Sequence, residues 1–175
     1  MARRTRTLSR LTLAPAAALA ALIGFAAAPA QAATWSSSDQ WGTYDVTVPS
    51  SGAYNTSYDI WDSDYDYDYD YEVMLWVNHN GAVGPLGTSQ GTLSLGGHTW
   101  TVYKGDNGSN QVFSFLRTSD SASGTVDVLP ILKWIKDTKG WWGNETIGDV
   151  QFGYEITSSA GGLDFRTNAF AVSAS

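Results

Sequence analysis

The 175-residue sequence predicts an all-β fold, a sandwich or barrel with one short helix. It is rich in aromatic residues, with 8 Trp, 9 Tyr and 6 Phe, and short stretches of alternating apolar and polar residues recur between turn signals. Between two such stretches, Gly96-Gly97 is typical of a two-residue hairpin loop, because Gly readily adopts a positive φ. Strands are expected at 43–48, 53–61, 69–78, 91–95, 98–104, 111–117, 124–128, 148–156 and 163–172.

One segment departs from this alternation. Leu129, Leu132 and Ile135 have helical spacing. Pro130 stands near the start of the segment and Gly140 just past its end, which is where helices favour these residues. The segment therefore predicts a single short helix.

The N-terminus has the features of a secretory signal peptide. Four Arg among the first ten residues precede an apolar, Ala-rich run at 11–28, and Ala30-Gln31-Ala32 fits a small-residue cleavage site. We expect a signal peptide at 1–32, a single domain at 33–175, and a secreted, extracellular protein. Arg3-Arg4 leaves both the Sec and the twin-arginine export route open.

Charge and composition exclude several classes of partner. Four of the 10 Lys and Arg lie in the signal peptide, so six remain against 17 acidic residues, a net charge of −11. Nucleic acid and anionic membranes are therefore not expected partners. Cys is absent and the two His, at positions 79 and 98, are far apart, so neither disulfides nor a metal site is expected. We expect a monomer without a cofactor.

The stretch DYDYDYDYEVMLWV, from Asp64 to Val77, places a carboxylate on a patterned strand. Alternate residues of a strand share a face, so Val73, Leu75 and Val77 form a core face, while Glu72, Met74, Trp76 and Asn78 point the other way. A carboxylate beside Met and Trp is typical of a sugar-binding cleft.

A second carboxylate lies in VQFGYEIT. Val150, Phe152, Tyr154 and Ile156 alternate as a buried row, which leaves Glu155 on the opposite face. Two carboxylates across a groove are what glycoside hydrolysis requires.

These residues resemble glycoside hydrolase family 12, a family of endo-β-1,4-glucanases (cellulases). YEVMLW, SYDIW upstream and QFGYE downstream match its motifs in order and spacing, and the match extends through GAVGPLG and TWTVYKGDNGSNQVFSF, roughly from Ser51 to the C-terminus. The resemblance implies a two-sheet jelly roll whose concave sheet forms the glucan groove.

The resemblance also implies roles for individual residues. Glu72 corresponds to the nucleophile, Glu155 to the acid/base, and Asp59 to a carboxyl that supports the nucleophile. Substrate-contacting residues are expected in the same groove: Asn55, Met74, Trp76, Asn107 and, through a weak match of DQWG to an N-x-W-G motif, Trp41.

The N-terminal side departs from the family pattern. Trp41-Gly42 precedes Ser51 by nine residues, where family members have several strands. The departure predicts missing N-terminal strands and an exposed sheet edge beside 43–48. The expected function is a retaining endo-β-1,4-glucanase acting on cellulose-like, mixed-linkage or xyloglucan chains. A glucan-binding remnant with little or no activity is the alternative, and a xylanase of the related jelly-roll family is a weaker one.

The Asp-Tyr run has two interpretations. An extended hairpin with Tyr on one face and Asp on the other is expected from the alternation. Asp62, Asp64 and Asp66 have the spacing of calcium ligands, but the EF-hand pattern also needs Gly at its sixth position and Glu at its twelfth, where this chain has Tyr67 and Val73.

Overall fold

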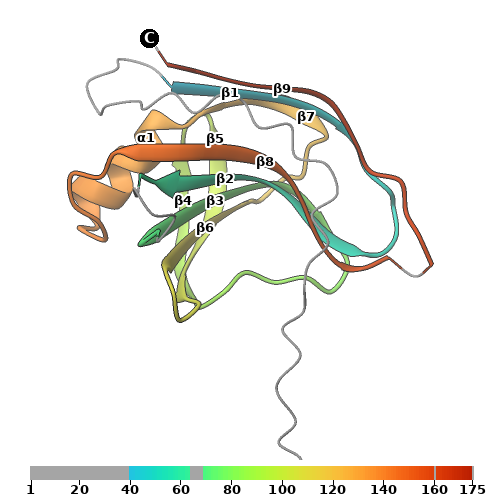
Figure 1. The fold of residues 1–175 in the computed structure, drawn as a ribbon, viewed down its shortest axis with the longest axis horizontal. Coiled ribbons are helices and arrows are strands. Elements are labelled where there is room, and N and C mark those ends of the chain that lie inside the picture. Colours follow the sequence, from blue (N-terminus) through green and yellow to red (C-terminus); the bar gives the residue numbers. More distant parts are fainter. Residues whose placement is uncertain (1–39, 64–68, 160, 175) are drawn as a thin grey trace, which may run out of the picture.

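The computed structural model describes residues 40–63, 69–159 and 161–174, which form a two-sheet β-sandwich with one short helix (Figure 1). Each expected strand is present. The strands are β1 (Gln40–Thr47), β2 (Ala53–Asp62), β3 (Tyr71–Asn80), β4 (Thr88–Leu95), β5 (His98–Asp106), β6 (Gln111–Arg117), β7 (Ser123–Asp127), β8 (Ile147–Ser158) and β9 (Arg166–Ala174). The predicted signal peptide lies outside these residues. None of the described helices is long and apolar enough to span a bilayer.

The two sheets differ in size. One has six strands in the order β4-β5-β6-β3-β2-β8, and the other has three in the order β7-β1-β9. Neighbouring strands are antiparallel except for β3 and β6, which pair in parallel. The expected jelly roll is therefore confirmed. We call the face of the six-stranded sheet that lies away from the three-stranded sheet the open face.

The hydrophobic core lies between the two sheets, as the alternation predicts. From β3, Val73, Leu75 and Val77 are fully buried in it. The three-stranded sheet contributes Tyr44 and Val126. Every second side chain of β3 over this stretch thus packs in the core, and the side chains between them point to the open face.

The helical segment closes one end of the sandwich. Helix α1 (Leu129–Lys133) continues into a π-helical turn (Trp134–Thr138). Ile131, Leu132 and Ile135 are fully buried in the core. The predicted short helix is confirmed, and Gly140 ends it with a φ of 60°.

The predicted exposed edge beside 43–48 is wrong. Strand β1 is the central strand of the three-stranded sheet, paired with β7 on one side and β9 on the other. The expectation failed because it considered only strands close to β1 in sequence, whereas β9 comes from the C-terminal end of the chain.

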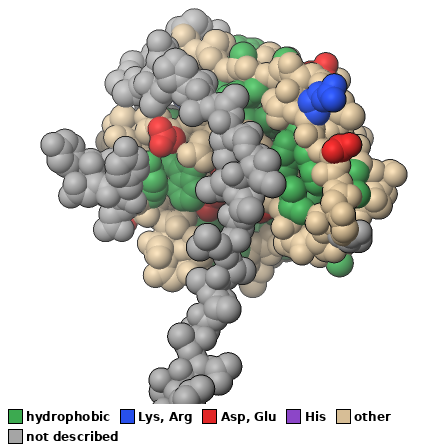
Figure 2. Space-filling model, turned by 45° about the vertical axis from the view of Figure 1, so that its right-hand side comes forward, with side chains coloured by type: hydrophobic (Ala, Val, Ile, Leu, Met, Phe, Trp, Pro, Cys, Tyr) green, Lys and Arg blue, Asp and Glu red, His purple; other side chains and the backbone are tan. Residues whose placement is uncertain are grey.

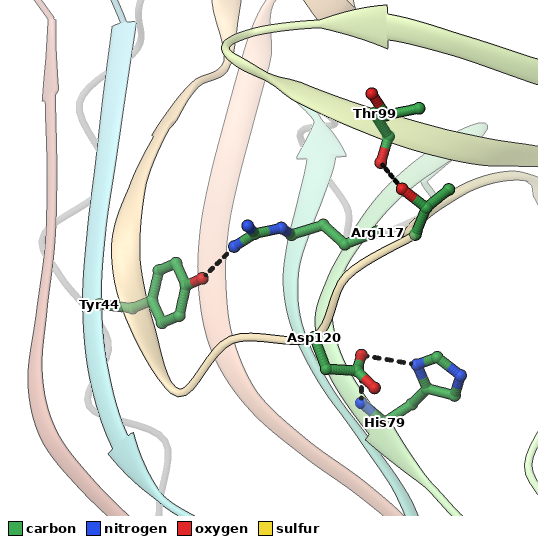
Figure 3. Close-up of polar contacts among 6 residues, drawn as sticks. Tyr44, His79, Thr99, Arg117 and Asp120 are labelled. Carbon is green, nitrogen blue, oxygen red and sulfur yellow. Dashed lines mark hydrogen bonds and ion pairs between the residues drawn. The ribbon is translucent and has the colours of Figure 1, made fainter.

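Polar contacts tie the two sheets together where the chain leaves β6 (Figure 3). Arg117 at the end of β6 donates to the Tyr44 hydroxyl on β1, with 2.8 Å between nitrogen and oxygen. In the following loop, Asp120 accepts from the backbone N–H of His79 and contacts the His79 ring nitrogen at 2.9 Å. The chain crossing from one sheet to the other is therefore anchored to both.

Close packing of the two sheets predicts a strong effect at Gly42. A Cβ atom at this position would lie 2.8 Å from the Tyr58 ring, which is itself fully buried. We expect Gly42→Ala to lower the free energy of unfolding by about 1–3 kcal/mol because the ring has no room to move. Thr43→Ala, on the exposed side of the same strand, should cost less than about 1 kcal/mol. Equal losses in urea denaturation would contradict this packing.

Candidate active site

Three neighbouring strands place carboxyl groups on the open face. Strand β2 lies between β3 and β8, and it carries Asp59, while β3 carries Glu72 and β8 carries Glu155. The register pairs Asn55 with Glu155 and Asp59 with Met74, so these side chains share one face. The structure thus brings together all three predicted catalytic residues.

Hydrogen bonds along β2 link two of these carboxyls. The Asn55 amide donates to the Glu155 carboxylate. Ser57, two residues further along the same face, donates to Asp59 at 2.7 Å and also lies 3.3 Å from the Asn55 side-chain oxygen. Asn55, Ser57 and Asp59 therefore form a buried polar row that runs beside Glu155. Sequence reasoning missed Ser57, although its place midway between Asn55 and Asp59 was a usable signal.

Glu72 is poised to hold a proton more tightly than an ordinary carboxyl. Its side chain is 9% exposed. Its pKa is raised from 4.5 to about 8, chiefly by burial and then by the negative charges of Asp59 and Glu155, while the Asn110 amide acts in the opposite direction. Asn110 was also missed from the sequence.

Asp59 shares this behaviour. Its pKa is raised from 3.8 to about 7, chiefly by burial; the hydrogen bond from Ser57 acts in the lowering direction and the charge of Glu155 in the raising direction. Because Asp59 and Glu72 each raise the cost of charging the cluster, they titrate as a coupled pair rather than as independent groups. The pair can retain one proton at neutral pH, and the higher pKa of Glu72 places that proton first on Glu72; its transfer to Asp59 would leave Glu72 ionised.

Apolar side chains form the floor beside Glu72. Met74 is 5% exposed and Trp76 is 2% exposed, and both pack with Val112 of the neighbouring β6. These residues form a small cluster separate from the main core. The floor lowers the local dielectric, which is the physical origin of the desolvation at Glu72.

Two other residues that were predicted to contact substrate either lie on the other sheet or already have hydrogen-bond partners. Trp41 is 41% exposed on β1, in the three-stranded sheet, so the core separates it from the open face. Asn107 lies in the β5–β6 turn, where its side-chain oxygen accepts from the backbone N–H groups of Ser109 and Asn110. Its amide nitrogen donates to the Asn110 side chain. Asn107 thus organises the turn.

A bulge changes which residues of β3 face the groove. Trp76 pairs with Ser57 and Asn78 pairs with Thr56, so Val77 is an extra residue between two pairs. Asn78 consequently joins the core side, and His79 takes the place opposite Asn55, near the Trp76 ring. The predicted outward direction of Asn78 is therefore wrong.

The predicted buried row of β8 needs one correction. Phe152 is buried in the core as expected. Ile156, however, is 39% exposed, near the end of a strand that forms the edge of its sheet. A bulge between the pairs Tyr54–Ile156 and Ala53–Ser158 disturbs the alternation at this point.

Residues 64–68, which make up most of the Asp-Tyr run, lie outside the described residues. The hairpin and calcium interpretations both concern this segment and stay predictions. Asp62, at its start, is 5% exposed and accepts from the backbone N–H groups of Asp70 and Tyr71. This carboxylate joins the two ends of the run. In the described part of the chain, no group of three or more His, Cys, Asp or Glu is suited to holding a metal ion.

Few basic side chains are exposed on one face of the molecule (Figure 2). On the face shown in Figure 2, hydrophobic and acidic side chains are exposed close together, and Lys or Arg is seen only near one edge of the view. Such a surface suits a neutral partner with apolar ring faces rather than an anionic one. Chemically, a buried carboxyl pair beside an exposed carboxylate can supply a nucleophile and a proton donor.

Comparison with known proteins gives a consistent result. A family model described as glycosyl hydrolase family 12 matches residues 29–174. Endoglucanase S of Pectobacterium parmentieri is 36% identical over 135 residues, which are 70% of this chain and 51% of that protein. Xyloglucan-specific endo-beta-1,4-glucanase A of Emericella nidulans is 33% identical over 139 residues, 77% of this chain and 56% of that protein.

Solved structures agree with these relatives. The xyloglucanase domain of NopAA, a type three effector from Sinorhizobium fredii in complex with cellobiose, superposes with a TM-score of 0.75 at 35% identity, over 83% of this chain and 72% of that one. A family 12 xyloglucanase from Bacillus licheniformis gives 0.71 at 27% identity, over 82% and 66%. The chain spans about half the length of the curated relatives it matches. The family match covers most of the sequence, and the chain therefore belongs to glycosyl hydrolase family 12.

Proposed function

We propose that this protein is a secreted, retaining endo-β-1,4-glucanase that cleaves cellulose-like, mixed-linkage or xyloglucan chains. The observation that carries the proposal is the carboxyl cluster of the open face, in which the charge of Glu155 acts on both Asp59 and Glu72. The N-terminal signal peptide predicted from the sequence supports secretion.

The first chemical step assigns each carboxyl a role. The ionised Glu72 attacks the anomeric carbon, the glycosidic bond breaks, and the proton of Glu155 passes to the departing oxygen. This step requires the proton of the coupled pair to move from Glu72, whose pKa is the higher, to Asp59, which then stabilises the charge that Glu72 carries before attack. A covalent glycosyl-enzyme ester results.

The second step restores the enzyme. The Glu155 carboxylate takes a proton from water, the resulting oxygen nucleophile attacks the anomeric carbon, and the ester bond to Glu72 breaks. The exposure of Glu155 suits this role because both the leaving group and the water approach from solvent. The Asn55 hydrogen bond fixes the carboxylate while it changes from acid to base.

The relatives support the substrate class. Their printed names describe an endoglucanase and xyloglucan-specific endo-beta-1,4-glucanases, and one related domain is in complex with cellobiose. The xyloglucan-specific enzymes are named for β-1,4 linkages, and cellobiose is itself a β-1,4-linked glucose dimer. The uncharged, apolar floor formed by Met74 and Trp76 is compatible with such a neutral polymer.

A glucan-binding remnant with little or no activity is the second candidate. It is favoured by the short connection inside the domain, where Trp41-Gly42 precedes Ser51 by only nine residues. Remote contacts with substrate supply the binding energy that distorts the sugar at the cleavage point, so a shorter groove would reduce turnover more than binding.

Hydrolysis of barley β-glucan and tamarind xyloglucan separates the two candidates. We expect new reducing ends from at least one polymer, and proton NMR at early times should show the β-anomer as the first product because two inversions give retention. A first product in the α-form would exclude the double displacement. Polymer binding without new reducing ends would favour the remnant.

A further inference from the structure

Asn110 occupies a position beside Glu72 that no part of the mechanism above uses. It immediately precedes β6, which pairs in parallel with β3 so that Gln111 lies opposite Tyr71 and Val112 opposite Glu72. Because alternate residues share a face, the side chains at 110 and 112 both point to the open face, next to Glu72. The Gln111 N–H donates to the Asp70 carbonyl at 2.9 Å and fixes the backbone there.

The orientation of the Asn110 amide is determined by its neighbour. The Asn107 side-chain oxygen accepts from the backbone N–H groups of Ser109 and Asn110, each at 2.9 Å. The other terminal atom of the Asn107 side chain is therefore the amide nitrogen, which donates to the Asn110 side-chain oxygen at 2.8 Å. This leaves the Asn110 amide nitrogen directed away from the turn.

That nitrogen has unused donor capacity in a buried place. Asn110 is 8% exposed, and its amide nitrogen has no partner in good hydrogen-bond geometry among the residues that the structure describes. A buried donor without a partner destabilises the folded state, so each one calls for an explanation. The neighbouring acceptor is the Glu72 carboxyl, whose charged form Asn110 favours.

We propose that Asn110 is a positioning residue for Glu72: its side-chain amide, oriented by Asn107, donates to one carboxylate oxygen and leaves the other free to attack the anomeric carbon. The inference rests on the proposed function for its kinetic meaning, but the contact itself can be tested without activity. In this arrangement Asn107 acts on the reaction through Asn110, and its own polar atoms stay within the turn.

The direct test is a titration of the Glu72 carboxyl by carbon-13 NMR, assigned with Glu72→Gln. We expect Asn110→Leu to raise the Glu72 midpoint by roughly one pH unit, since a hydrogen bond to a charged group is lost. Asn110→Asp keeps the shape but replaces the donor by an acid, so its midpoint should rise further. Asn107→Asp retains the oxygen for the turn, loses the donor to Asn110, and should give an intermediate shift.

Two controls keep the test decisive. Ser109→Ala, an exposed residue of the same turn, should leave the Glu72 midpoint unchanged. In the unmodified protein, the Asn110 side-chain NH₂ signals should titrate with the Glu72 midpoint, and this titration should disappear in Glu72→Gln. NH₂ signals that do not follow Glu72, or a Glu72 midpoint unaffected by Asn110→Leu and Asn110→Asp, would overturn the proposal.

Kinetics provide a separate readout. On an aryl cellobioside, Asn110→Leu should lower kcat about tenfold with little change in KM, because the contact orients the nucleophile rather than the sugar. If the unmodified protein hydrolyses no glucan, the proposed function fails, while the titration still decides whether Asn110 contacts Glu72. If the midpoint shifts as expected but KM rises instead of kcat falling, the positioning role is wrong.

Discussion

Glu72→Gln should abolish hydrolysis of both β-glucan and aryl cellobiosides. The amide keeps the shape of the side chain but cannot form the glycosyl ester, so a good leaving group brings no rescue. Glu155→Gln should also lose activity on β-glucan, by about 100- to 10,000-fold, because no acid protonates the departing oxygen. It should keep measurable activity on a dinitrophenyl cellobioside, whose leaving group needs little acid assistance.

The activities of the two variants should therefore differ only on the activated substrate. Initial rates on β-glucan and on dinitrophenyl cellobioside, measured side by side, provide the comparison. Asp164→Asn, at an exposed position, serves as a matched carboxyl control. Equal residual activity of Glu72→Gln and Glu155→Gln on the activated substrate would contradict the assigned roles.

Neutralising a carboxyl of the buried pair should stabilise the protein at alkaline pH. The folded-state pKa of Asp59 is raised from 3.8 to about 7 and that of Glu72 from 4.5 to about 8. Between the ordinary and the raised values the folded state binds more protons than the unfolded state. The stabilisation from protonating these groups is therefore complete below about pH 4 and is lost as the pH rises through 7 to 8.

Asp59→Asn and Glu72→Gln each remove one such group. We expect their free energy of unfolding, relative to the unmodified protein, to increase by about 1–2 kcal/mol between pH 5 and pH 8. Urea denaturation at the two pH values measures this difference, and Asp164→Asn should show almost none. A variant that becomes less stable than the unmodified protein as the pH rises would mean that the carboxyl is ionised and paired in the folded state.

Period-two alternation was sufficient to predict much of this site. It placed Val73 and Leu75 in the core and hence Glu72 and Met74 on the opposite face of β3. The same reasoning placed Glu155 away from Phe152. These predictions succeeded because strand geometry is local, and a buried row on one face determines the direction of the remaining side chains.

The failures come from features that alternation does not encode. The bulge at Val77 reverses Asn78 and brings His79 to the groove, and nothing in the local pattern signals an extra residue. Asn110 meets Glu72 only because β6 pairs with β3, a contact between segments far apart in the sequence. Trp41 lies on the other sheet for the same reason: strand order is a property of the whole chain.

Trapping of the covalent intermediate tests the central claim most directly, because it identifies the attacking residue. A 2-deoxy-2-fluoro cellobioside with a dinitrophenyl leaving group should form the glycosyl-enzyme and then hydrolyse slowly, since fluorine destabilises the positively charged transition state of the second step. Mass spectrometry of proteolytic fragments should find the added sugar on Glu72 and on no other residue, and Glu72→Gln should remain unlabelled. A sugar attached to Glu155 or Asp59, or hydrolysis of β-glucan by a protein that this reagent never labels, would contradict the assignment of Glu72 as the nucleophile.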